Sequence, residues 1–319
     1  MTLIDKRNYL FDNLKGFLII CVIIGNSLEY ANPTSIDLNY FILFLYIFHM
    51  PLFAFISGYF NIRSKRTTQE KVISILKIYL FAQIFYFLAN KLLFGDLNSK
   101  INFFAPTWTM WYFISLMSWY IISDFIKNKK RWFIISILIS LYVGFDQSIG
   151  SYASISRTFF FLPYFIAGMG FKEEYFEKLR KYKYKLAIVS VVFFIILYSV
   201  SDFVPVELFF EYTNYSTYSD SSLFAFIIRI FHYISSFVVI AFLIGVAPKT
   251  RTSLSKIGQA SLVLYVSHGF IIKLLYKYSP INYSTPLNIL MAELAILILT
   301  ITVSILLIAL SSIIKKRKV

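Results

Sequence analysis

Stretches of mostly apolar residues alternate with short polar segments along the whole chain, and ten such stretches are each close to the ~20 residues that a helix needs to cross a bilayer. The pattern predicts an all-α, polytopic integral membrane protein that forms one transmembrane domain over residues 1–319. The predicted spans are 13–30, 38–60, 72–94, 108–126, 132–148, 156–171, 185–204, 222–246, 257–277 and 287–314.

Lysine and arginine follow a second alternation, between the connections. They are concentrated in the even-numbered connections and at both ends of the chain, and they are almost missing from the odd-numbered connections. Cytoplasmic segments of membrane proteins carry such an excess, so the pattern predicts an even number of spans and cytoplasmic termini. Residues that mark the cytoplasmic side include Lys6, Arg7, Arg63, Lys65, Lys127, Lys129, Lys178, Arg180, Lys249, Arg251, Lys315 and Lys316.

The composition agrees with a multi-pass protein of the cytoplasmic membrane. The chain is 58% hydrophobic and 20% aromatic, with a net charge of +15. Because the basic residues lie in the connections, this charge indicates topology and contact with anionic lipid rather than a nucleic-acid partner. The segment 172–185 combines lysines with aromatic residues, which predicts a helix at the membrane interface.

The N-terminal segment resembles a signal peptide in having Lys6 and Arg7 ahead of an apolar run. Lys15 interrupts that run, and no clear small-residue cleavage site follows it, so we expect an uncleaved first span. The single Cys21 lies inside this span, makes no intrachain disulfide and is expected to pack. No CxxC motif or Cys/His cluster indicates a metal site.

Four polar side chains interrupt the first predicted span: Asp12, Lys15, Asn26 and Glu29. At about 100° per residue, the eleven steps from Lys15 to Asn26 make three turns plus about 20°, so both side chains lie on one face. Asp12 lies one turn before Lys15, and Glu29 lies one turn after Asn26. Since polar groups at membrane depth usually face a bundle interior or a wet cavity, this face predicts a buried site.

Other spans also hold polar groups at membrane depth. In the second span, His49 lies beside Pro51, which frees the carbonyl of Ile47 from its helical hydrogen bond and so requires a donor from a neighbouring helix. In the sixth span, Arg157 precedes Pro163. The remaining candidates are Trp111 and Tyr112 in the fourth span, His268 with Tyr265 in the ninth, and a weaker pair, Arg229 and His232, in the eighth.

Each candidate also has a purely structural interpretation. A tryptophan or tyrosine at a span end usually belongs to the aromatic belt, and a membrane histidine often packs as a hydrogen-bonding group. Arg157 could extend its head group to the interface, and Asp12 could be a helix N-terminal acid. For Arg229 and His232, the structural interpretation is favoured. The joint occurrence of the candidates in one bundle is what favours a functional site.

Five motifs occur in a fixed order along the chain. They are D-N-L-K-G-x-L-I-I-x-V-x-x-G-x-S at 12–27, F-H-M-P-L-F-x-F-x-S-G-Y at 48–59, W-Y-F from 111, R-x-F-x-F-L-P-Y-F-x-x-G at 157–168 and S-L-x-L-Y-x-x-H at 261–268. Together they resemble the membrane acyltransferase 3 family, most closely its fucose 4-O-acetylase-like bacterial branch. The resemblance covers essentially the whole chain.

The resemblance implies a ten-helix bundle that transfers an acyl group, usually acetyl from cytoplasmic acetyl-CoA, to a hydroxyl of a cell-surface or lipid-linked carbohydrate. Lys15, with Asp12 beside it, would hold the acyl-CoA as a cation facing an anion. His49 and Arg157 would orient the acceptor or stabilise oxyanion charge. His268 would be an orienter or alternate base, and Glu29, Trp111 and Tyr112 would contact the acceptor sugar. The implied partners are acyl-CoA, the carbohydrate and membrane lipid, with no metal and no nucleic acid.

The sequence departs from the family at one position. The family's first-span signature is Arg or Lys, ten residues, then His; here Lys15 fills the first position and Asn26 the last. An amide does not titrate near neutrality as imidazole does, so loss of a general base predicts transfer slowed by about 10²–10⁴. Three explanations stay open: an engineered, impaired His-to-Asn variant, a natural member whose base is another residue such as His49 or His268, or a natural member that binds without catalysis.

Two functions of other classes also fit the pattern. A transporter or flippase of a lipid-linked sugar would place polar groups in kinked spans, although no repeated half is present. A non-catalytic binding or assembly subunit would retain its function when the candidate residues are lost. The sequence leaves open the acceptor glycan, the choice between acetyl and another acyl group, the side of the membrane where transfer ends and the oligomeric state.

Overall fold

The computed structural model describes residues 8–31, 36–150, 152–217, 219–279 and 285–316, and within these ranges the chain forms helices and no strands. The α-helices are α1 (Tyr9–Ala31), α2 (Ile36–Tyr46), α3 (His49–Asn61), α4 (Thr68–Leu92), α5 (Trp111–Ser123), α6 (Lys129–Val143), α7 (Ile155–Gly170), α8 (Glu173–Val200), α9 (Glu207–Phe210), α10 (Ser222–Val246), α11 (Ser253–Gln259), α12 (Ser261–Tyr278) and α13 (Pro286–Lys316). Three short 3₁₀ helices join them: η1 (Trp108–Met110), η2 (Tyr152–Ser154) and η3 (Tyr215–Thr217).

Each predicted span coincides with a helix or a pair of helices. In the described part of the chain, six helical segments are long and apolar enough to cross a membrane, and α11–α12, bent by 77°, makes a seventh if it counts as one span. The predicted spans at 108–126, 132–148 and 156–171 overlap α5, α6 and α7, which have only 13, 15 and 16 residues. The structure therefore confirms a membrane helical bundle, while the count of ten spans and the cytoplasmic termini remain predictions.

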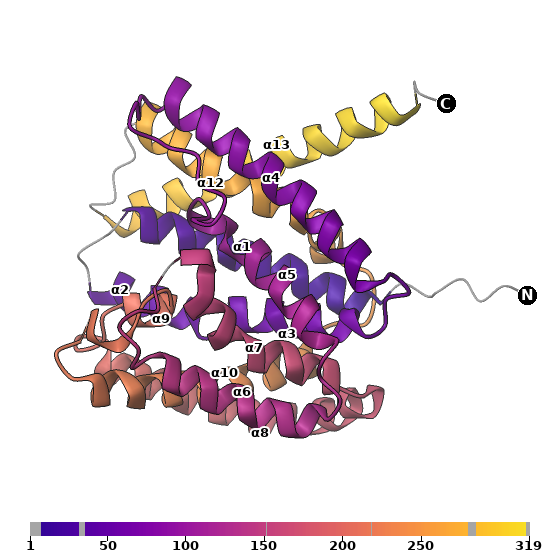
Figure 1. Cartoon of the computed structure of the whole chain (residues 1–319), viewed down its shortest axis with the longest axis vertical. Helices are drawn as coiled ribbons and strands as arrows, with labels where there is room; N and C mark the ends of the chain where they lie inside the picture. The colour runs from indigo at the N-terminus through magenta and orange to yellow at the C-terminus, as the bar shows by residue number, and fades with distance from the viewer. Residues whose placement is uncertain (1–7, 32–35, 151, 218, 280–284, 317–319) are drawn as a thin grey trace, which may run out of the picture.

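The helices form a central group with one further group on each side of it. Figure 1 shows α1, α3, α5 and α7 across the middle of the bundle, with α4, α12 and α13 on one side and α6, α8 and α10 on the other. The central helix α1 contacts both α3 and α12, which carry other predicted site residues. This arrangement brings the family motifs of α1, α3, α7 and α12 into one interior.

Pro51 breaks the second predicted span as expected. Leu38–Asn61 is long enough for one span, but α2 ends at Tyr46 and α3 begins at His49. The carbonyl of Ile47 is freed from the helical ladder, and the hydroxyl of Ser236 in α10 donates a hydrogen bond to it. The predicted donor from a neighbouring helix is thus present, and the break holds the His49 ring at the centre of the bundle.

Glycines set the closest crossing of the central group. A Cβ atom built on Gly168 of α7 would contact the backbone oxygen of Phe55, and one built on Gly58 of α3 would contact the backbone oxygen of Phe165. Residues without a Cβ let membrane helices approach backbone to backbone. The motifs that contain His49 and Arg157 therefore lie on two helices that pack as one unit.

The segment 172–185 is helical, as predicted, but it is continuous with the following span. Both belong to α8, a single helix of 28 residues that begins at Glu173. The second half of α8 exposes Ile188, Val191 and Ile195, as a lipid-facing helix does. The interfacial character is therefore a property of the first turns of a long helix.

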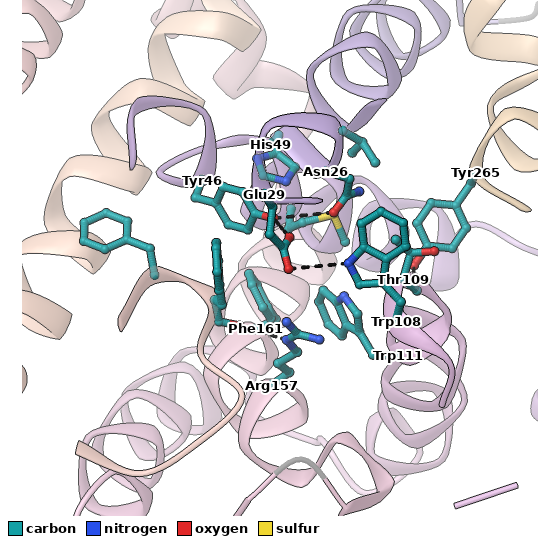
Figure 2. Close-up of a pocket in the computed structure, with 14 residues that line it drawn as sticks. Asn26, Glu29, Tyr46, His49, Trp108, Thr109, Trp111, Arg157, Phe161 and Tyr265 are labelled. Atoms are coloured by element: carbon teal, nitrogen blue, oxygen red, sulfur yellow. Dashed lines mark hydrogen bonds between the residues drawn. The ribbon is translucent and has the colours of Figure 1, made fainter. Parts of the chain in front are cut away.

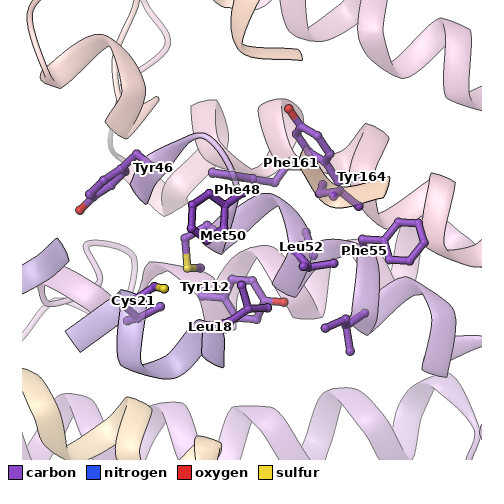
Figure 3. Packing of buried hydrophobic residues seen from close by; sticks show 14 of the residues in the cluster. Leu18, Cys21, Tyr46, Phe48, Met50, Leu52, Phe55, Tyr112, Phe161 and Tyr164 are labelled. Atoms are coloured by element: carbon purple, nitrogen blue, oxygen red, sulfur yellow. The ribbon is translucent and has the colours of Figure 1, made fainter. Parts of the chain in front are cut away.

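The first helix packs into an apolar core between α3 and α5. Figure 3 shows Leu18 and Cys21 of α1 beside Met50 and Leu52 of α3 and Tyr112 of α5. Cys21 is a free, buried thiol with 5% of its surface exposed, so the expectation that it packs is confirmed. The apolar face of α1 is thus used for packing, and its polar face remains for a site.

Candidate functional site

A narrow cavity of about 20 Å³, here called the polar cavity, opens where α1, α7 and the break between α2 and α3 meet. Its volume is enough for about one water molecule. Figure 2 shows the side chains of α1, α3, α7 and η1 converging on it. Five of the predicted site residues line it: Asn26, Glu29, His49, Trp111 and Arg157.

Asn26 lies between this cavity and His268. The Asn26 Nδ2 atom is 3.1 Å from His268 Nε2, while His268 Nδ1 is 2.7 Å from the carbonyl of Tyr265 and 3.2 Å from that of Leu264. Carbonyls only accept, so the proton is on Nδ1, and Nε2 accepts from the Asn26 amide. His268 is fully buried behind Asn26, and its position supports orientation of Asn26 rather than contact with a ligand.

Glu29 is held by two donors, Tyr46 and Trp108, that are not among the predicted site residues. The Tyr46 hydroxyl donates to Glu29 Oε2 at 2.6 Å and lies 3.5 Å from Asn26 Oδ1, and Trp108 Nε1 donates to Glu29 Oε1 at 3.4 Å. Tyr46 precedes His49 by three residues across the helix break, and Trp108 precedes Trp111 by three residues. Both lie next to predicted residues in sequence, which is the signal that could have identified them.

His49 is the histidine that lines the polar cavity. Its Nδ1 is 2.7 Å from the carbonyl of Leu45, which also accepts a hydrogen bond from the Phe48 backbone N–H at 3.2 Å. Since that carbonyl accepts, Nδ1 carries the proton and Nε2 is the basic nitrogen of the neutral ring. The Tyr46 ring meets the imidazole edge-on with centroids 4.6 Å apart, which fixes its orientation. This histidine therefore has a general base's atom at the cavity wall.

Arg157 is held at the opposite wall by an aromatic clamp. Its Nε donates to the carbonyl of Phe210 at 2.8 Å, and its guanidinium lies 4.7 Å from the Trp111 ring centroid and 5.1 Å from that of Tyr212. Figure 2 shows the guanidinium beside Trp111 and facing Glu29. The charge is thus directed into the bundle, where it can stabilise an anion or an oxyanion.

A second cavity of about 160 Å³, here called the apolar cavity, is lined by two further predicted residues, Lys15 and Tyr112. Lys15 lines it and forms an ion pair with Asp12 at 2.9 Å. Tyr112 also lines it and exchanges a hydrogen bond with Ser57 at 2.8 Å. Tyr112 therefore lines the same cavity as Lys15, whereas its neighbour Trp111 lines the polar cavity.

Arg229 and His232 belong to a buried cluster behind the polar cavity. Arg229 forms an ion pair with Glu211, and His232 Nδ1 lies 3.6 Å from Glu211 Oε1. Phe209, which lines the cavity, stacks on the His232 ring at 4.5 Å. The pair thus holds the segment after α8 against the bundle, in agreement with the structural role favoured for it. Within the residues that the structure describes, no group of three or more Asp, Glu, His or Cys side chains could hold a metal ion.

One family model matches nearly the whole chain. The family model described as an acyltransferase domain matches residues 8–309. The chain is also similar to the nodulation protein NolL of Sinorhizobium fredii, 43% identical over 58 residues, and to NolL of Mesorhizobium japonicum, 40% identical over 86 residues. These alignments cover 17% and 24% of this chain, and 16% and 23% of the relatives' own lengths. No solved structure matches the chain significantly.

Proposed function

Since the chain belongs to the acyltransferase family whose model spans residues 8–309, we propose that it transfers an acetyl or other short acyl group from acyl-CoA to a carbohydrate hydroxyl. The acceptor in this proposal is a cell-surface or lipid-linked carbohydrate. The observation that carries the proposal is the polar cavity, because residues of all five motifs line it from separate helices. A reaction that joins two substrates needs such a meeting point inside the membrane.

The donor enters from the apolar cavity in this proposal. Lys15 is 25% exposed at its wall and meets the phosphates or the thioester carbonyl of acyl-CoA. Asp12 orients the ammonium group through their ion pair. The apolar side chains of Ile19 and Phe53 contact the uncharged end of the pantetheine arm.

The acceptor hydroxyl lies in the polar cavity, where His49 acts as the base. His49 Nε2 takes the hydroxyl proton as the acceptor oxygen attacks the thioester carbonyl carbon. Arg157 stabilises the oxyanion that forms. When the carbon–sulfur bond breaks, the imidazolium returns the proton to the departing thiolate, so the products are the ester and free coenzyme A.

Asn26 has a supporting role in this chain. Its amide nitrogen donates to His268, and its amide oxygen faces the Tyr46 hydroxyl. Asn26 therefore connects His268, through Tyr46, to the Glu29 carboxylate. Glu29 and Tyr46 together bind a further hydroxyl of the sugar, and Trp111 contacts the apolar face of the ring. This assignment corresponds to a natural member whose base is another residue.

The test is transfer of radiolabel from acetyl-CoA to glycan by membranes that contain the full chain. His49→Gln keeps a hydrogen-bonding group without a titrating nitrogen, so it should lower transfer by about 10²-fold or more. Lys15→Ala in the same assay should instead raise the donor concentration needed for half-maximal rate.

The control is folding: His49→Gln and the wild-type chain should have the same Tm in detergent, so that a loss of transfer reflects loss of the base. Wild-type transfer by His49→Gln would remove His49 as the base. Transport of an intact glycan in the absence of any acyl donor would contradict the enzyme and favour a flippase.

A further inference from the structure

The polar and apolar cavities share two lining residues, Met50 of α3 and Tyr265 of α12. The Tyr265 hydroxyl donates to the carbonyl of Thr109, and its ring meets that of Phe113 edge-on at 5.3 Å, so Tyr265 is anchored. Met50 has no such anchor in its unbranched side chain, which adapts to its surroundings by rotation. Met50 and Tyr265 thus form the partition between the two cavities, and Met50 is the side chain of the two that can change its conformation.

Met50 fills the space through which an acyl chain would have to extend. Only 6% of its surface is exposed, and Figure 3 shows it packed near Cys21 and Tyr112. A thioester that enters beside Lys15 and reacts with a hydroxyl in the polar cavity places its carbonyl carbon at the partition. The methyl group of an acetyl unit then meets Met50 directly, and longer chains require the volume of its side chain.

We propose that Met50 sets the acyl-chain length that this protein accepts, so that it admits the acetyl group and excludes chains of about four carbons or more. The inference rests on the proposed function, because it takes acyl-CoA as the donor. It also decides the choice that the sequence left open between acetyl-CoA and other acyl-CoA donors. The physical reason is that each methylene that a packed apolar pocket cannot hold reduces acceptance by about 10- to 200-fold.

The probes are two unreactive thioethers, S-ethyl-coenzyme A and S-hexyl-coenzyme A, and the measurement is their affinity for the purified full chain by calorimetry. The wild-type protein should bind the ethyl compound at least about 10-fold more tightly than the hexyl compound. Met50→Ala should strengthen hexyl binding by about 10-fold or more and change ethyl binding by less than about 3-fold. Met50→Val, a smaller truncation, should shift the same ratio in the same direction. Because nothing is transferred, the result does not depend on the base.

Met169→Ala is the matched control, since Met169 is a buried methionine of α7 that lines neither cavity. It should leave the ethyl-to-hexyl ratio unchanged. An unchanged ratio in both Met50 variants, with ethyl binding intact, would overturn the role of Met50 while leaving acyl-CoA as the donor. An equal gain in Met169→Ala would also overturn it, because the gain would then reflect general loosening. Absence of binding of either thioether to the wild-type chain would overturn the donor assignment itself.

Discussion

At the scale of single residues, the chemistry of the site turns on where the imidazoles lie relative to Asn26. His268 is locked by two backbone carbonyls and by the Asn26 amide, and it does not line the polar cavity. His49 does line it, with one nitrogen committed to Leu45. The amide at position 26 therefore contacts a histidine that does not line the polar cavity, while His49 does line it, and this difference makes position 26 testable.

Replacement of Asn26 by His should add a titrating group to the cavity. One nitrogen of the new ring can meet His268 Nε2 as the amide does now, and the other can accept a proton from the acceptor. We expect acetyl transfer in membranes to rise by about 10²-fold, and Asn26→His should restore transfer to His49→Gln. Asn26→Gln, which keeps the amide, should give no gain. Equal transfer by the wild-type chain and Asn26→His would remove position 26 from the chemistry.

At the scale of elements, the site depends on helices that are broken or tightly apposed. The interruption at Ile47 presents the His49 ring to the interior, and the missing Cβ atoms of Gly58 and Gly168 bring α3 and α7 together. The helix break and the glycine crossing both position the site's side chains through the backbone of helices, not through loops. Disturbing the backbone contact should therefore affect the site and the stability together.

Gly168→Ala tests this coupling. The added methyl would contact the Phe55 carbonyl and lie 2.9 Å from the Tyr59 backbone nitrogen, so α3 and α7 must separate. We expect a loss of about 1–3 kcal/mol in the free energy of unfolding, visible as a lower Tm in detergent, together with reduced acetyl transfer. Gly150→Ala is the control, because a Cβ there meets no atom within 4 Å. Equal Tm values for the two variants would contradict the role of the crossing.

At the scale of the whole molecule, hydrophobic periodicity predicts the helical bundle and the positions of most of its helices well, while the number of spans and the topology remain predictions. The polar face of α1 and the requirement created by Pro51 were also readable, because both follow from local geometry. Tyr46, Trp108 and Glu211 were not predicted as partners, since their contacts join segments far apart in the chain. Glu211 in particular has a left-handed backbone with φ of 57° in an irregular segment, for which no periodic signal exists.

The topology can be mapped on a background without native thiols, because the chain has one cysteine and it is buried. In Cys21→Ser protein, a cysteine in place of Ser64 lies in a basic connection, and one in place of Asn98 lies in a connection with few basic residues. With a maleimide that does not cross membranes, we expect intact cells to label position 98 and only inverted vesicles to label position 64. The reverse labelling would contradict cytoplasmic termini.

The size of the polar cavity has a consequence for the kinetics of this protein. A space of about 20 Å³ holds about one water molecule, and no monosaccharide fits within it while Phe209 and Phe210 stand at its wall. Those two rings precede Glu211, which is tethered to Arg229 in the bundle interior. In the proposed reaction, admission of a sugar would require this wall of the cavity to move outward, and the frequency of that motion would then limit turnover, however fast the acyl transfer itself is.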